Sequence, residues 1–213
     1  MYGLQATTVP ATAIVSVAEQ KSHMRLLGRD ANDPDVLAYL LFAESYVTSL
    51  TNHVFQPTTY RYTLDRPPAQ YGYRYVYNFG FRANAIEFPV GPLLSVGSIT
   101  YKVTDPVSGL YVDTLIDPAT YQVSATQIPG RVMPRGGQFW PFGSVFALEG
   151  MVLTFTAGYA SPANVPPAAR MAVKLLAGYM YENREPLTIA NVVGSVPITM
   201  KHLTDNLKLS GYV

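Results

Sequence analysis

The sequence contains no cysteine among its 213 residues. Without thiols the chain can form neither a disulfide framework nor a thiolate metal site. Charge is also scarce, because Asp, Glu, Lys and Arg make up only 14% of the residues, against roughly 25% in an average domain. The formal net charge is +1, and Lys and Arg are dispersed along the chain. No basic stretch therefore indicates nucleic-acid binding.

Long apolar runs are missing as well. No window approaches the roughly 18 consecutive apolar residues of a membrane-spanning helix. The N-terminal stretch MYGLQATTVPATA lacks the basic segment and the apolar core of a signal peptide. We therefore expect neither a membrane span nor a secretory leader.

Tyrosine is abundant where charge is not: the chain has 16 Tyr. Surfaces rich in aromatic residues and poor in Lys and Glu are typical of protein interfaces. Tyr is also common in β-strands, so an ordinary β-domain is the alternative explanation. Composition favours the interface explanation over this alternative.

Three helices are predicted, at residues 16–27, 33–52 and 165–184. Ser16 and Glu19 have the spacing of a capping box, in which each side chain bonds the other residue's backbone N–H. Asp33-Pro34 supplies an N-cap and a first-turn proline to the second helix. The third helix begins at Val165-Pro166-Pro167 and is expected to be the hub of the domain. Its apolar positions recur every three to four residues.

Two further expectations concern single helical residues. Gly178 lies in the middle of the third helix, where glycine costs about 1 kcal/mol relative to alanine. That cost suggests that another backbone passes close to Gly178. On the second helix, Glu44, Thr48 and Thr51 are expected to lie towards the side opposite the apolar stripe.

Between the second and third helices the period changes to that of strands. Tyr-rich residues 71–81 are aromatic at alternate positions and fit either a hairpin or an exposed loop. The sequence DPVSG at 105–109 has the composition of a turn. The predicted strands are 58–64, 85–88, 96–103, 111–115, 121–124, 130–133 and 151–157.

These elements predict an α+β fold. A helical bundle, made of two N-terminal helices and a long helix in the C-terminal half, carries an inserted antiparallel β-domain and flexible termini. The expected divisions are a flexible arm at 1–15, a helical core at 16–57 and 159–186, a β-domain at 58–158, and a tail with a short helix at 187–213.

The sequence offers few candidates for a catalytic or metal-binding site. His23, His53 and His202 are far apart and belong to no metal-binding motif, so surface or packing roles are favoured over ligation. Nucleophile-elbow, Walker and dinucleotide-binding motifs are absent. Glu182 and Glu185 could in principle act as acid and base, although an ion pair with Arg184 is the simpler reading. We therefore expect no enzyme activity, no metal and no cofactor.

Arg131, Arg135 and Trp140 lie in or next to a glycine-rich connection. Trp and Arg are frequent anchors of interfaces, so this region could bind an anion or a partner. Equally, Trp140 could cap the core of the β-domain. The residues alone leave both possibilities open.

The order of several segments resembles a known family. A capped helix SVAEQKSHMRL is followed by DPDVLAYLLFAESYVTSLTN, FPVGPLLSVGSITY, YQV and RGGQFWP. A strand then leads into TFTAGYASPANVPPAARMAVKLLAGYMYENRE. From about residue 16 to 207 the chain is similar to the phage head–tail connector (adaptor) proteins of the gp6-like type, in the longer variety with a β-insertion. The stretch at 71–81 and the arm at 1–13 depart from that pattern.

The resemblance implies a structural protein of the virion neck, assembled in the host cytoplasm. Such proteins form a ring, usually of twelve copies, under the portal, and the ring extends the DNA channel. Partners implied are other copies of the chain, the portal protein, and a neck stopper or tail protein. DNA would pass without sequence-specific binding, and no membrane is involved. A near-neutral charge suits a channel wall, because dense Lys and Arg would hold phosphates.

The resemblance also suggests contact residues. The C-terminal segment of such proteins commonly reaches into the portal, which points here to Ile198, Met200, Leu203, Leu207 and Tyr212. For the interface between subunits, aromatic content and anchor type point to Tyr73, Tyr75, Tyr77, Trp140 and Arg135.

Two other functions are kept as alternatives. The first is a neck stopper or tail-completion protein, although the capped helices before the β-domain argue against a mainly β stopper. The second, more remote, is a glycan-binding virion module, motivated by Trp140 and the aromatic stretch 71–81.

Overall fold

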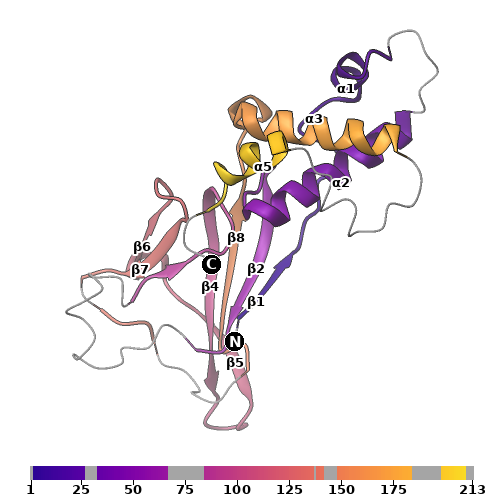
Figure 1. Cartoon of the computed structure of the whole chain (residues 1–213). Coiled ribbons are helices and arrows are strands. Elements are labelled where there is room, and N and C mark those ends of the chain that lie inside the picture. Colours follow the sequence, from indigo (N-terminus) through magenta and orange to yellow (C-terminus); the bar gives the residue numbers. More distant parts are fainter. Residues whose placement is uncertain are drawn as a thin grey trace. The chain divides into compact units, whose positions relative to one another are not determined.

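The computed structural model describes residues 2–26, 33–66, 84–136, 138–141, 148–183 and 198–209. The chain divides into two compact units. One contains Pro57–Gly158 together with the N-terminal residues through Val9, and the other contains Pro10–Gln56 and Tyr159–Ser210. Helices and antiparallel sheets are both present, so the α+β class is confirmed (Figure 1).

The first unit is built from strands. Its five-stranded antiparallel sheet has the order β1-β2-β8-β4-β5, and a three-stranded sheet has the order β3-β7-β6 (Figure 1). The bounds are β1 Tyr2–Ala6, β2 Thr58–Leu64, β3 Ile86–Glu87, β4 Leu93–Thr104, β5 Tyr111–Leu115, β6 Tyr121–Ser124, β7 Arg131–Pro134 and β8 Met151–Ala157. Strands β2, β5, β6 and β8 have the predicted bounds, because turn residues and apolar alternation mark both of their ends.

The central strand β8 organises this unit. Its side chains alternate between buried and half-buried positions, as expected of a strand with one face on a core. Phe155 is fully buried and lies between two aromatic rings, with centroid distances of 4.5 Å to Phe88 and 5.5 Å to Tyr60. The β8 strand pairs with β2 on one side and with β4 on the other. The core of the sheet unit therefore contains a cluster of three aromatic rings around Phe155.

Strand β1 differs from the expectation for the N-terminus. Residues 1–13 were expected to form a loose arm, yet Tyr2–Ala6 pair with β2 from Tyr2↔Leu64 to Ala6↔Tyr60. The backbone N–H of Thr7 then donates to the carbonyl oxygen of Thr59 at 2.8 Å. The sequence pattern of β1 is weak because all its side chains that can be described are exposed. Its strand conformation comes from pairing with β2, which lies about 60 residues further along.

The second unit is helical. Its described α-helices are α1 Val17–His23, α2 Asp33–Thr51, α3 Pro167–Glu182 and α5 Ile198–Asp205 (Figure 1). Fully buried Leu40 and Ala43 of α2 share a core with Ala169 and Val173 of α3. Phe55 and Leu207 belong to the same core. The α3 helix thus has the central place predicted for it, since its apolar stripe faces the core of this unit.

The expectation for Gly178 was wrong. A Cβ at this position would meet the side chains of Gln20 and Met24 on α1, with Nε2 of Gln20 at 3.7 Å and Cγ of Met24 at 3.9 Å. Both distances are ordinary van der Waals contacts, and neither neighbour is a backbone atom. The glycine is therefore not required by a close approach of backbones.

The orientation expected for Glu44 and Thr51 was also wrong. Glu44 is 8% exposed and Thr51 1% exposed, although polar residues were expected on the side of α2 away from the core. Segments flanking the helix cover these residues. Thr51 donates its hydroxyl to the carbonyl oxygen of Val47 at 2.7 Å, which allows a polar residue to be buried at the end of the helix.

Candidate functional site

Among the described residues of the sheet unit, several exposed apolar side chains lie on β5 and on the turn that precedes it. Val107 is 93% exposed and Leu115 is 61% exposed. Between them, side chains on both faces of the strand are open to solvent. The exposed apolar residues here are Val107, Leu110, Tyr111, Val112 and Leu115. A group of this kind on a soluble surface is typical of a site for protein contact.

The turn before β5 is held by Asp105. Its carboxylate accepts the hydroxyl of Ser108 at 2.6 Å and the backbone N–H of Val107 at 3.1 Å. These hydrogen bonds, led by that from Ser108, lower the pKa of Asp105. Gly109 follows with φ +69°, a left-handed conformation that glycine adopts without strain. The predicted turn at 105–109 is confirmed, and it fixes where β5 begins.

Trp140 and Arg135 have roles inside the sheet unit. Trp140 is 3% exposed, and its indole N–H donates to the carbonyl oxygen of Asn84 at 2.7 Å. Its ring lies 6.5 Å from that of Tyr121. Nε of Arg135 donates to the backbone oxygen of Tyr121 at 2.8 Å. Of the two readings for Trp140, its burial favours the packing role, and it leaves no open indole face on which a sugar could stack.

The other three residues suggested for the subunit interface, Tyr73, Tyr75 and Tyr77, lie outside the described residues. So does Tyr212 of the tail.

The tail helix α5 packs on the helical core. Leu207, directly after it, is 7% exposed and belongs to the core, and Leu203 is half-buried against it. The backbone N–H of Leu209 donates to the carbonyl oxygen of Thr51 at 3.1 Å. Ile198 and Met200 lie in the first turn of α5, and their side chains are outside the description. Leu207 therefore serves the interior of its own unit.

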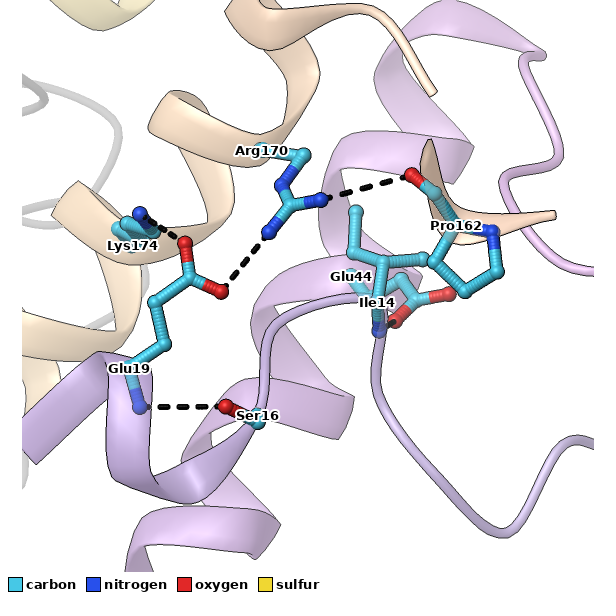
Figure 2. A network of polar contacts seen from close by, with 7 residues as sticks. All are labelled: Ile14, Ser16, Glu19, Glu44, Pro162, Arg170 and Lys174. Atoms are coloured by element: carbon cyan, nitrogen blue, oxygen red, sulfur yellow. Dashed lines mark hydrogen bonds and ion pairs between the residues drawn. The ribbon is translucent and has the colours of Figure 1, made fainter. Parts of the chain in front are cut away.

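A polar network joins α1 to α3 (Figure 2). Ser16 caps α1, its hydroxyl oxygen accepting the backbone N–H of Glu19 at 3.1 Å. The Glu19 carboxylate does not return to the backbone of Ser16, as a full capping box would require. It pairs instead with Arg170, at 2.8 Å from Nη2, and with Lys174. The hydrogen bond from Lys174 is the main cause of a lowered pKa of Glu19.

Gln20 adds a buried contact to the same junction. Its side chain is fully buried, and Nε2 donates to the backbone oxygen of Lys174 at 3.1 Å. Arg170 also donates to the carbonyl oxygen of Pro162 at 3.5 Å. Together with the Glu19 pairs, these contacts fix α1 on α3. The charged residues of this network therefore have structural partners.

Glu44 forms a second polar junction, also drawn in part in Figure 2. Its Oε2 accepts the backbone N–H of Ile14 at 3.0 Å, and its Oε1 accepts from Nε2 of Gln56 at 2.8 Å. Burial raises the pKa of Glu44, while these two hydrogen bonds act in the opposite direction. The carboxyl group ties both flanking segments to α2. The sequence did not predict this junction, because the pattern showed only where Glu44 lies along the second helix and not which segments it contacts.

The histidines do not converge on a site. His53 is buried beside Phe55 and Tyr159, with ring centroids 6.3 Å away in each case. Burial lowers its pKa, which favours the neutral form of the ring. Within the described ranges, no group of three His, Asp or Glu side chains could hold a metal ion. Nor does any described helix have the length and apolarity needed to cross a membrane.

The two-unit α+β architecture has relatives among solved structures. Within the neck of an empty gene transfer agent particle, computed with C6 symmetry, a chain matches with a TM-score of 0.74 and 21% sequence identity, covering 99% of this chain and 97% of that one. A chain in the virion of the native particle matches with a TM-score of 0.72, 22% identity and the same coverage of each chain.

A third match comes from the neck of the native particle, computed with C12 symmetry. Its TM-score is 0.68 and its identity 19%, again over 99% of this chain and 97% of that chain. No protein-family model and no curated protein matches the sequence. At these identities the likeness establishes a shared fold over nearly the whole of both chains.

Proposed function

We propose that this chain is a structural protein of the neck of a phage-like virion, acting as a head–tail connector (adaptor). The observation that carries the proposal is the full-length likeness in fold to chains in gene transfer agent particles. Both units of the chain contribute to it, since the match covers 99% of the residues. The segment order that resembles head–tail connectors supports the same function independently.

In this function twelve copies of the chain form a ring under the portal. The helices build the body of the ring, the channel continues through it, and the far surface receives a stopper or tail component. Two of the fold neighbours belong to necks computed with C6 and C12 symmetry, which is compatible with a twelve-fold ring. Genomic DNA passes without specific binding, and catalysis has no part in the function.

The experiment is to locate the chain in assembled particles. A short epitope inserted at the exposed residues 125–127, between β6 and β7, is labelled with antibody fragments, and the particles are imaged by electron cryomicroscopy. We expect twelve-fold density in the layer directly against the portal. Label on the shell, on the tail fibres or on no particle would contradict the proposal. Label one layer further from the portal would instead favour a stopper or tail-completion protein.

A further inference from the structure

We propose that neighbouring copies join edge to edge, with β5 of one copy pairing with β1 of the next to extend the five-stranded sheet across the subunit boundary. The inference rests on the proposed ring function and names the surface through which the ring closes. Both strands belong to the sheet unit, and they are its two outermost strands: the order is β1-β2-β8-β4-β5 (Figure 1).

The outward backbone groups of β5 follow from its pairing with β4. Asp105 N–H donates to Leu110 oxygen at 2.9 Å, and Ile116 N–H donates to Ile99 oxygen at 2.8 Å. In an antiparallel pair, residues bonded to the partner strand alternate with residues whose groups point away. Tyr111, Asp113 and Leu115 therefore direct their N–H and C=O groups away from β4. No described strand lies on that side.

The outward backbone groups of β1 follow from its pairing with β2. Thr7 N–H donates to Thr59 oxygen at 2.8 Å, in register with the pairing of β1 and β2. Alternation then turns the backbone groups of Tyr2, Leu4 and Ala6 away from β2. Each edge thus offers three residues with outward donors and acceptors, and each strand is five residues long.

Neither edge carries the usual protection against pairing. Soluble proteins guard open edges with lysine, proline, bulges or inward charges. The β1 strand, YGLQA, has no charged residue and no proline. The β5 strand, YVDTL, has Asp113 as its one charge, and Tyr111, Val112 and Leu115 are exposed. Strands of this kind are suited to pair with another strand.

A second copy of the chain is the occupant that fits both edges. Rings of more than two subunits need a heterologous interface, in which two different surfaces of the same subunit meet. Four successive antiparallel pairings make β1 and β5 run in the same direction within a subunit. A neighbour related by rotation about an axis along the strands would therefore bring its β1 parallel to β5. Pairing of β5 with β5 would instead close a two-fold dimer.

The absence of cysteine allows a clean test by cross-linking. The strand register places the side chains of Gln5 and Asp113 on the same face of the sheet. Gln5→Cys and Asp113→Cys are introduced singly and together into the full chain, and assembled particles are treated with a short bis-maleimide. Within one subunit four strand spacings separate β1 from β5, about 19 Å at about 4.8 Å per spacing, so a short linker joins different subunits. We expect a ladder of covalent oligomers only for the double variant.

Two results would overturn the inference. One is dimer formation by Asp113→Cys alone, which indicates two-fold pairing of β5. The other is the absence of any ladder from double-variant particles in which imaging still locates the chain in a neck ring; the proposed function then stands and the edge pairing fails. Particles in which the chain is found elsewhere refute the function itself.

A pair of backbone variants checks the hydrogen bonds directly. Leu4→Pro removes an outward N–H and leaves the bonds between β1 and β2 intact, whereas Leu4→Ala changes the side chain and keeps the N–H. We expect Leu4→Pro to lower incorporation into the ring and Leu4→Ala to retain it, with circular dichroism showing that both chains are folded. Equal incorporation of the two variants would contradict pairing through β1.

Discussion

At the scale of single residues, two carboxyl groups connect separate segments of the helical unit. Glu44 receives hydrogen bonds from Ile14 and Gln56, and Glu19 pairs with Arg170 and Lys174. The two carboxyl groups respond to pH in opposite directions, because burial raises the pKa of Glu44 and the partners of Glu19 lower its pKa. Each gives a stability prediction of known sign.

For Glu44 we compare the free energy of unfolding of the wild type with that of Glu44→Gln as a function of pH. The pKa of Glu44 in the folded chain is raised from 4.5. The stability that its carboxyl group contributes is therefore fully present below about pH 4.5 and is lost as pH rises through the folded pKa. The advantage of the wild type over Glu44→Gln should therefore shrink as pH rises above 4.5. Chemical denaturation at several pH values measures it.

Glu19→Gln is the matched control for that series. In the folded wild type the pKa of Glu19 is lowered from 4.5. The stability that the Glu19 carboxylate contributes is therefore present above about pH 4.5 and is lost as pH falls through the folded pKa. The advantage of the wild type over Glu19→Gln should shrink on acidification below 4.5. Two variants with the same pH profile would show that the assigned environments are wrong.

Gly178 gives a second prediction at this scale. Its missing Cβ would make only ordinary contacts with Gln20 and Met24, and it lies inside α3. Gly178→Ala should raise the free energy of unfolding by roughly 0.5–1 kcal/mol, the difference in helix propensity. Gly109→Ala, where φ is +69°, should instead destabilise by roughly 1 kcal/mol. Urea denaturation measures the free energy of unfolding of both variants. A loss of stability in Gly178→Ala would mean that the site is more crowded than these distances indicate.

At the scale of elements, α5 and β5 differ in whether their apolar side chains, or those directly beside them, are covered. The segment after α5 places Leu207 in the helical core, whereas β5 leaves Tyr111, Val112 and Leu115 exposed. Both were recognisable from sequence as an element with apolar positions. Segments that are distant in sequence decide which of these apolar positions are covered, and the local pattern carries no information about those segments.

Leu207 gives the prediction for the tail. Leu207→Ala should lower the free energy of unfolding of the isolated chain by about 2–3 kcal/mol, because a buried leucine loses its packing. Lys208→Ala, at an exposed neighbouring position, should change it by less than about 0.5 kcal/mol. Thermal and urea unfolding provide the measurement. An unchanged stability for Leu207→Ala would reassign this residue to contact with a partner.

The local patterns located most elements, and for four strands they also located the ends. Helix caps and apolar periodicity placed α2 and α3, and turn chemistry placed β2, β5, β6 and β8. Strand β1 was missed, since its exposed residues carry no alternation and it is held by β2. Trp140 could be read either way, because only the position of Asn84 and Tyr121 decides whether its indole is covered.

At the scale of the whole molecule, the balance of charge matters most for the proposed function. The chain has 15 Lys and Arg against 14 Asp and Glu. Binding to DNA without sequence preference depends on neutralising phosphates with basic residues. A neutral wall would let DNA pass through a channel with little retention.

The isolated chain should therefore bind duplex DNA weakly at 0.15 M salt, with a dissociation constant above about 10⁻⁴ M, the weak limit of non-specific binding. Fluorescence anisotropy with a labelled duplex measures this, and a variant with four added surface lysines serves as the positive control. Tight binding by the wild type, lost as salt is raised, would contradict a neutral channel wall.

The sequence by itself determined the types and positions of most helices and strands, and it excluded disulfides and thiolate sites. Those properties depend on residues close together in the chain, whose caps, turns and periodicity act locally. Only the tertiary structure decided that Tyr2–Ala6 form an edge strand, that Glu44 and Trp140 are buried, and that β1 and β5 bound the same sheet. These depend on contacts between segments tens of residues apart, which a local pattern cannot encode.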